Sequence, residues 1–314
     1  MVYNAFVINF ASMEKEKIFE IDCIDNYNKV IGAETLHPLV TVVNVNELPQ
    51  WLNGMTVHYS VYGLFLKQGE GCSMRYGREK YDYQAGSIVT LAPGQTVKVE
   101  WRHDLPMPPS RALLFHPDLM HGTALGRKIR EYAFFDYSQR EALHLSDRER
   151  ATITGLLDQI TAEMEHPVDH HSQTLITDVI ALLLDYCMRY YDRQFITRHK
   201  VCSDILAAFE HQVREYFSNG HAEAAGIPTV AYFADRANLS TSYFGDLIKK
   251  EAGMTAQSYI QEALISQSKQ MLLERALTIN EIAYQLGFQY PQHFTRLFKN
   301  KVGMTPNEYR RQAV

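Results

Sequence analysis

The last third of this 314-residue chain contains one sequence pattern twice. Residues 234–259 are echoed by residues 283–309. The residues Phe244, Leu247, Lys249, Gly253, Met254, Thr255 and Tyr259 recur at a spacing of 50, as Phe294, Leu297, Lys299, Gly303, Met304, Thr305 and Tyr309. Before these positions the spacing is 49, because Phe233 and Ala234 match Ile282 and Ala283. The second copy therefore has one extra residue, which a loop can absorb.

The second copy has the signals of a helix, a tight turn and another helix. Thr278 and Glu281 form a capping box, in which each side chain satisfies a free backbone N–H of the other. Gly287 ends the first helix, since glycine adopts the left-handed conformation at low cost. After a loop, Phe294 and Phe298, with Leu297, have the spacing of a buried helix face. Two apolar helix faces that meet across a short turn form a helix-turn-helix.

The first copy predicts the same unit. A helix with Phe233, Ala234 and Ala237 ends at Asn238, and Ser240 is the expected N-cap of the next helix, whose buried residues are Phe244, Leu247 and Ile248. A long helix from about Ala256 to Ala276 would connect the two units. The last helix begins at Thr305-Pro306-Asn307-Glu308, with threonine at the N-cap and proline at the first helical position.

These motifs resemble the AraC/XylS family of bacterial transcription regulators. The resemblance spans roughly residues 205–309 and is most specific in residues 282–288, 293–299 and 303–306 and at Tyr309. It implies that two recognition helices enter successive major grooves on one face of DNA. The residues expected to face bases are Ser242, Gly245 and Asp246 in the first recognition helix and Gln292, His293 and Arg296 in the second. A guanidinium such as that of Arg296 binds guanine O6 and N7 together, and Gln292 suits adenine.

Basic and polar residues near these helices suit phosphate contacts. The candidates are Lys249, Lys250, Thr295, Lys299, Lys301 and Arg310, and a solvated helix face is the alternative for any single lysine. Gly245 and Asp246 depart from the family pattern, in which an arginine or another long polar donor is more usual, and the Asp246 carboxylate repels phosphate. It either accepts a hydrogen bond from cytosine or contacts a neighbouring side chain. We therefore expect the second unit to carry more of the direct base readout.

Charge restricts the mode of DNA binding. The whole chain has a formal net charge of −5, which argues against indiscriminate affinity for nucleic acid. The positive charge gathers at the end of the chain. From residue 280 onward there are only two acidic residues, Glu281 and Glu308, but five basic ones: Arg296, Lys299, Lys301, Arg310 and Arg311.

The first part of the chain reads as short strands. Residues 57–65 and 81–91 are rich in β-branched and aromatic residues and are separated by turns that contain glycine. Residues 86–94 resemble the second motif of cupin barrels. We therefore predict an α+β protein of two domains, with an N-terminal cupin-like β-barrel (jelly roll) flanked by helices and a C-terminal all-α tandem helix-turn-helix domain. The expected boundaries are 1–140 for the barrel, 141–199 for linking helices and 200–314 for the DNA-binding domain.

The predicted barrel lacks the ligands of a cupin metal centre. The chain has no His-x-His pair, and Gln95, Thr96 and Val97 follow the Pro93-Gly94 turn where a metal-binding cupin has histidine. We expect no metal, no cofactor and no enzymatic activity. Instead, aromatic residues are candidates for an effector pocket, with plain core packing as the alternative: Tyr59, Tyr62, Phe65, Tyr83 and Trp101.

The linking residues predict two amphipathic helices. The first begins at the Ser146–Glu149 capping box and has an apolar stripe of Ile153, Leu156, Leu157, Ile160 and Met164. The second, from about Ser172 to Asp192, has Leu175, Ile176, Val179, Leu182, Leu183, Tyr186 and Tyr190. By resemblance such helices dimerise, and packing on their own barrel is the alternative.

The partners expected from the resemblance are double-stranded promoter DNA, a small-molecule effector, a second copy of the chain and RNA polymerase if the protein is an activator. Barrel occupancy or dimer geometry would then bias how freely the recognition helices reach DNA. Two other classes remain open: a cupin-type small-molecule enzyme, and a ligand-binding adaptor with a helical tail. Four cysteines without paired spacing, no signal sequence and no apolar run of about 20 residues predict a cytoplasmic protein without a membrane span.

Overall fold

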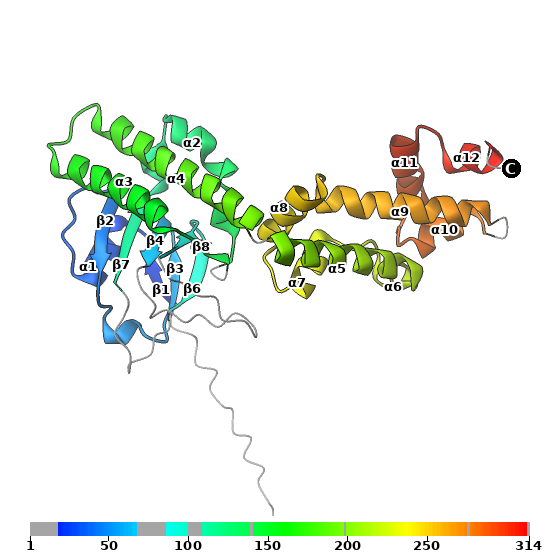
Figure 1. The fold of residues 1–314 in the computed structure, drawn as a ribbon, viewed down its shortest axis with the longest axis horizontal. Helices are drawn as coiled ribbons and strands as arrows, with labels where there is room; N and C mark the ends of the chain where they lie inside the picture. The colour runs from blue at the N-terminus through cyan, green and yellow to red at the C-terminus, as the bar shows by residue number, and fades with distance from the viewer. Residues whose placement is uncertain are drawn as a thin grey trace, which may run out of the picture. The chain divides into compact units, whose positions relative to one another are not determined.

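The computed structural model describes residues 18–67, 86–99, 109–138, 141–197, 199–274 and 277–312. The chain divides into two compact units, each assembled from two segments. The first contains Met1–Arg127 and Ser146–Ala181, and the second contains Lys128–Leu145 and Leu182–Val314. The first unit holds the strands β1 to β7, and the second is mainly helical (Figure 1).

Two sheets form the first unit. One has the spatial order β1 (Ile18–Ile21), β3 (Thr56–Tyr59), β6 (Gln95–Lys98). In the other the neighbours are β2 (Val40–Val45), β7 (Ser110–Phe115), β4 (Tyr62–Lys67) and β5 (Ser87–Leu91), in this order. The pair β1 and β3 is parallel, whereas β3 and β6, and all neighbours in the second sheet, are antiparallel.

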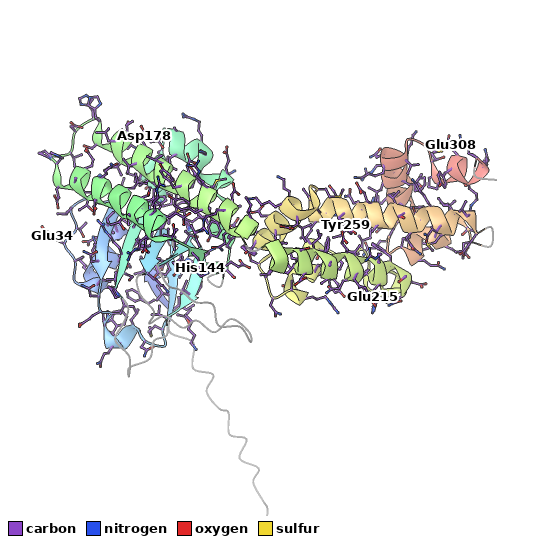
Figure 2. The ribbon with its side chains drawn as sticks, in the orientation of Figure 1. Glu34, His144, Asp178, Glu215, Tyr259 and Glu308 are labelled. Carbon is purple, nitrogen blue, oxygen red and sulfur yellow. The ribbon has the colours of Figure 1, made fainter. Side chains whose placement is uncertain are left out.

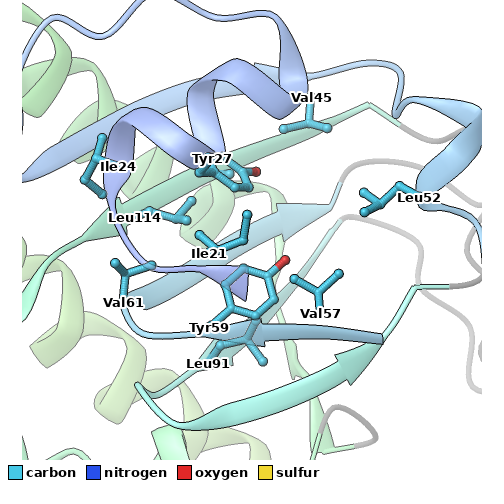
Figure 3. Close-up of a cluster of buried hydrophobic side chains, with 11 residues drawn as sticks. Ile21, Ile24, Tyr27, Val45, Leu52, Val57, Tyr59, Val61, Leu91 and Leu114 are labelled. Carbon is cyan, nitrogen blue, oxygen red and sulfur yellow. The ribbon is translucent and has the colours of Figure 1, made fainter. Parts of the chain in front are cut away.

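Strand register determines which side chains fill the space between the sheets. Phe65 lies opposite Ala112, and Gly63 lies opposite both Leu91 and Leu114, so these residues share one face of the second sheet. They meet residues of β1, β3 and helix α1 (Ile24–Ile31) in one hydrophobic cluster (Figure 3). Its buried members are Ile21, Ile24, Tyr27, Val45, Leu52, Val57, Tyr59, Val61, Leu91, Ala112 and Leu114.

The opposite face of the second sheet is also buried. Leu64, Leu113 and Phe115 share this face and are fully buried. Arg111 extends from the same face to helix α3 (Asp147–Glu165), where it donates to the Thr154 carbonyl, to Asp158 and to Thr161. A sheet covered on both sides explains why every residue of β5 is buried.

The predicted barrel is confirmed only as a β-rich unit with two sheets. Residues 86–94 form the expected strand and turn, because β5 ends at Leu91 and Gly94 has a φ of +90° before β6 begins. This turn carries the chain from one sheet to the other. The sheets do not join into a closed barrel within the described ranges. Tyr83 and Trp101 lie outside those ranges.

Short helical segments follow β7. In chain order they are η2 (Pro117–Met120), α2 (Ala124–Lys128), η3 (Ile129–Glu131) and η4 (Ala133–Asp136). One further 3₁₀ turn, η1 (Gln50–Leu52), lies earlier in the chain, between β2 and β3. The short strand β8 (Leu143–His144) comes next. Residues 128–145 belong to the second unit, although they precede α3 of the first.

Helix α9 (Ala256–Leu273) is the axis of the second unit, and Figure 1 shows it as one long helix. It contacts helices from both copies of the repeat. The remaining helices are α5 (His199–Ser218), α6 (His221–Ala225), α7 (Val230–Arg236), α8 (Thr241–Ala252), α10 (Ile279–Gln285), α11 (Pro291–Val302) and α12 (Pro306–Gln312). Tyr259 on α9 and Glu308 on α12 are labelled in Figure 2. The sequence placed the end of the connecting helix about three residues too late.

The two linking helices show one success and one error of the hydrophobic pattern. The predicted stripe of α3 is buried in full, from Ile153 to Met164, and the Ser146–Glu149 capping box is present. In α4 (Ser172–Thr197) the predicted residues Leu175 and Leu182 are exposed instead. Its buried face runs through Ile176, Ile180, Leu183, Leu184, Cys187 and Tyr191. A helix this rich in apolar residues has several periodic stripes, and only its packing partners select one.

Candidate nucleic-acid interface

The two repeats fold into the same turn. In the first copy Leu239 N–H donates to the Ala234 carbonyl over 3.0 Å, and in the second Phe288 N–H donates to the Ala283 carbonyl over 3.0 Å. These pairs are related by the spacing of 49 seen in the sequence. Asn238, with a φ of +55°, takes the position that Gly287 occupies with a φ of +87°. Asparagine tolerates this left-handed conformation better than most residues, so the repeat keeps its turn without glycine.

The caps also match the prediction. Ser240 caps α8 by accepting from the Tyr243 N–H, and Thr255 caps α9 by accepting from the Ser258 N–H. Thr278 and Glu281 form both hydrogen bonds of the capping box, and Thr305 and Glu308 repeat them at α12. Hydrogen bonds from backbone N–H groups lower the pKa of Glu281 and of Glu308, because they favour the ionised carboxylates.

The second recognition helix, α11, presents a polar face. Phe294 and Phe298 are fully buried, whereas Gln292, His293 and Arg296 are exposed. Lys299 and Lys301 in the last turn are exposed as well. All three side chains expected to read bases thus lie on the solvent-facing side of one helix, followed by two cations.

The first recognition helix, α8, has a different environment. Ser242, Gly245 and Asp246 are only half-exposed. Asp246 accepts a hydrogen bond from the Tyr137 hydroxyl over 2.7 Å, which corresponds to the second of the two roles open for it in the sequence. Tyr137 was absent from the predicted site, and no sequence signal connects residues 109 positions apart.

The phosphate candidates fall into three groups. Lys249, Lys299 and Lys301 are exposed. Lys250 forms an ion pair with Asp192, and the Thr295 hydroxyl donates to the Pro291 carbonyl within its own helix. Arg310 differs from the rest, because its Nε donates to the Leu272 carbonyl near the end of α9 over 3.1 Å. The guanidinium of Arg310 is therefore engaged in the fold.

The candidates for an effector pocket do not share one surface. Tyr59 and Phe65 both contact the cluster between the sheets, with ring centroids 6.4 Å apart. Burial raises the pKa of Tyr59 to about 12. Tyr62 lies on the other face of β4, three residues from Phe65, where it stacks on Phe115 at 5.0 Å. A strand sends residues at odd spacing to opposite faces, so Tyr62 and Phe65 cannot line one cavity.

Two histidine-bearing segments could be imagined to bind a metal, around His116 and at His170-His171, and both have other contacts. His116 caps η2 by accepting from the Asp118 N–H. The rings of His170 and His171 contact each other before α4. Over the described part of the chain, no group of three His, Cys, Asp or Glu side chains is arranged to hold a metal ion. No helix in the same residues is long and apolar enough to cross a membrane.

Comparison with known proteins identifies the C-terminal region. A family model described as a helix-turn-helix domain matches residues 233–312. The HTH-type transcriptional regulator YijO of Escherichia coli (strain K12) is 26% identical over 72% of this chain and 76% of its own length. The HTH-type transcriptional activator RhaS of Yersinia pestis is 29% identical over 32% of this chain and 36% of its own. The chain thus spans about three quarters of one relative and a third of the other.

A solved structure is also similar to part of the chain. The C-terminal domain of AraT, a response regulator from Geobacillus stearothermophilus, is 27% identical, with a TM-score of 0.31, over 34% of this chain and 84% of that one.

The tandem helix-turn-helix and these matches define a class, the HTH-type transcription regulators, which are typically not enzymes. Within that class, the chain belongs to the AraC/XylS family, and residues 233–312 form its AraC-type helix-turn-helix domain.

Proposed function

We propose that this protein regulates transcription by binding a specific double-stranded DNA site with α8 and α11 in successive major grooves. The observation that carries the proposal is the polar face of α11, on which Gln292, His293 and Arg296 are all exposed. Helices that enter the major groove need such a face, because base edges are read by side-chain donors and acceptors.

Each part of the interface has a proposed role. Arg296 reads guanine, Gln292 reads adenine, and His293 contacts the adjacent base edge. Lys249, Lys299 and Lys301 neutralise phosphates, which gives affinity but no sequence information. Helix α9 has 18 residues and a length of about 27 Å, of the same order as the roughly 34 Å repeat of the major groove.

The first unit is proposed to be a cupin-like module that senses a small-molecule effector, contributes to a homodimer, or both. Support comes from the two sheets of this unit and from the strand and turn of residues 86–94, which resemble a cupin motif. We further propose a cytoplasmic protein that acts on promoter DNA, and on RNA polymerase if it is an activator. Regulation then requires an effector that binds one conformation of the protein more tightly than the other.

The test is a selection of genomic DNA fragments with the purified full-length protein at near-physiological salt. Wild type should enrich a site of about two helical turns. Arg296→Ala should lose about 1–3 kcal/mol of specific binding and relax the preference at one position. Arg148→Ala is the matched control, because Arg148 is exposed on α3 of the first unit and its loss changes the net charge equally.

Two results would contradict the proposal. If wild type and Arg296→Ala enrich the same DNA sites equally, Arg296 of α11 does not read bases. Weak binding of every duplex with no steep dependence on salt concentration would favour the adaptor class, in which the helices contact another protein.

A further inference from the structure

The two recognition helices are related by the repeat, so the exposure of equivalent side chains on α8 and α11 can be compared directly. Tyr243 and Asp246 of α8 correspond to His293 and Arg296 of α11 at the spacing of 50. His293 and Arg296 are exposed, whereas Tyr243 is 7% exposed and Asp246 is half-buried. Other residues of the protein therefore cover the positions on α8 whose equivalents on α11 are exposed to solvent.

The cover comes from residues that follow η4. The Tyr137 hydroxyl donates to Asp246 Oδ2 over 2.7 Å, and the Tyr137 ring meets the Tyr243 ring edge-on with centroids 5.2 Å apart. From the end of α4, the Phe195 ring contacts Tyr243 as well, at 5.0 Å. Both aromatic contacts fall on the position equivalent to the exposed His293.

A carboxylate occupies the N-terminus of α8. Glu141 is 6% exposed and accepts from the Ser240 backbone N–H over 2.6 Å and from the Ser240 hydroxyl over 2.5 Å. Its Oε2 also accepts from the Ser138 N–H over 2.7 Å. Helix N-termini favour anions, and in DNA complexes their N–H groups bind phosphates. Glu141 therefore satisfies α8 with the kind of group that a DNA phosphate would supply.

A third contact involves a phosphate candidate. Lys250, in the last turn of α8, pairs with Asp192 of α4 and lies 5.1 Å from the centre of the Phe195 ring. Asp246 on the base face, the N-terminus and a basic side chain of α8 are thus each engaged by a residue of the same compact unit.

The covering residues are themselves fixed to α4. Gln194 accepts from the His144 N–H over 2.8 Å and donates to the Ala142 carbonyl over 3.3 Å, and the Tyr191 hydroxyl donates to the Glu141 carbonyl over 3.1 Å. Residues 141–144 and the last turns of α4 therefore behave as one piece. Because α4 begins at Ser172 within the first unit, the chain itself connects this piece to that unit.

We propose that Tyr137, Glu141, Asp192 and Phe195 form a latch that keeps the first recognition helix from DNA, so that a two-helix complex forms only after the latch opens. This inference rests on the proposed function. The described conformation would then engage DNA through α11 alone. The affinity for a complete site is reduced by the fraction of molecules in which the latch is closed. The contact is rich in polar groups, which water can replace, and this suits a reversible device.

The experiment compares two conservative variants with a matched control, all in the full chain. Tyr137→Phe removes the hydroxyl that bonds Asp246 and keeps the ring on Tyr243. Glu141→Gln removes the charge at the α8 N-terminus and keeps the shape. Tyr132→Phe is the control, since it lies in the same segment and also loses a hydrogen-bonded hydroxyl, but that hydroxyl donates to Asp185 of α4, over 2.9 Å. The DNA probe is the duplex that wild type enriches in the selection above.

We expect Tyr137→Phe and Glu141→Gln to bind this duplex about tenfold tighter than wild type and to protect a longer footprint. Tyr132→Phe should bind like wild type. In hydrogen exchange without DNA, the α8 amides of the two latch variants should exchange faster while the α11 amides stay unchanged. That second readout separates an opened latch from general unfolding, which would raise exchange in both helices.

Equal or weaker binding by both latch variants, on a duplex that wild type binds, would overturn the latch and leave the proposed function intact. So would unchanged exchange in α8. Failure of wild type and of all variants to bind any duplex would overturn the proposed function, and the latch with it.

Discussion

Gly287 lies against Gly226 so closely that a Cβ at Gly287 would be 2.6 Å from the Gly226 carbonyl carbon. The same Cβ would be 2.7 Å from the Ala222 carbonyl oxygen and 2.8 Å from the Ile227 nitrogen. The turn of the second helix-turn-helix is thus packed onto the chain that follows α6. Gly287 serves two purposes, since it adopts a φ of +87° and also leaves room for that backbone.

Gly287→Ala should therefore destabilise the helical unit by more than the conformational cost alone. A positive φ costs an alanine about 1 kcal/mol, and the backbone clash adds to it, so we expect a loss of at least about 2 kcal/mol in the free energy of unfolding. Gly253→Ala is the control, because Gly253 has a φ of +70° and a Cβ there would meet nothing within 4 Å. Urea unfolding measures both. Equal losses would show that packing against Gly226 contributes nothing.

Lys299 and Arg310 should respond differently to the same substitution. Lys299→Ala removes an exposed cation of α11. It should lower the slope of log K against log salt by about 0.9 for every duplex sequence. Arg310→Ala instead removes the donor to the Leu272 carbonyl, so its main effect should be on the thermal stability of the helical unit. Binding titrations at several salt concentrations, with melting curves, separate the two. If Arg310→Ala instead lowers the slope by about 0.9, as expected for one lost phosphate contact, Arg310 contacts the DNA after all.

Acid should weaken the second helix-turn-helix through Glu281. Its pKa is lowered from 4.5 by hydrogen bonds from Thr278, so the ionised carboxylate favours the folded state. This stability is fully present above about pH 4.5 and is lost as pH falls through the lower folded pKa. Glu281→Gln keeps a hydrogen-bond acceptor but does not titrate. Its stability should therefore change less than that of wild type between pH 5.5 and pH 3.5, as measured by urea unfolding. Parallel pH profiles would contradict the prediction.

Arg111 and Asp158 should contribute unequally to the first unit although they form one ion pair. The Arg111 side chain is 13% exposed and also bonds Thr154 and Thr161 of α3, whereas Asp158 is 64% exposed. Arg111→Met leaves these α3 acceptors without their donor and should cost about 1–3 kcal/mol. Asp158→Asn affects only a solvated pair and should cost less than about 1 kcal/mol. Thermal unfolding of both variants decides this, and a larger loss for Asp158→Asn would refute it.

The recognition helices illustrate which features can be predicted from residues that are close in sequence. Capping residues, left-handed turn positions and apolar spacing act within a few residues of each other, so Ser240, Thr278 and Gly287 were predictable in place and role. The apolar stripe of α4 was not, because Leu175 and Leu182 satisfy helical spacing as well as Ile176 and Leu183 do. The sequence also did not separate Tyr62 from Phe65, which are near in sequence but lie on opposite faces of β4.

The sequence by itself determined the duplicated helix-turn-helix, its caps and its turns, because these depend on interactions between residues close along the chain. Only the tertiary structure decided which side chains cover Tyr243 and Asp246 of α8 while the equivalent residues of α11 stay exposed. Tyr137 and Glu141 reach Asp246 and Ser240 across 109 and 99 residues. No pattern in the sequence encodes such a contact, because it arises from the way the chain folds back on itself. The repeat explains why α8 and α11 form equivalent helices, and the tertiary contacts explain why Tyr243 and Asp246 of α8 are covered whereas His293 and Arg296 of α11 are exposed.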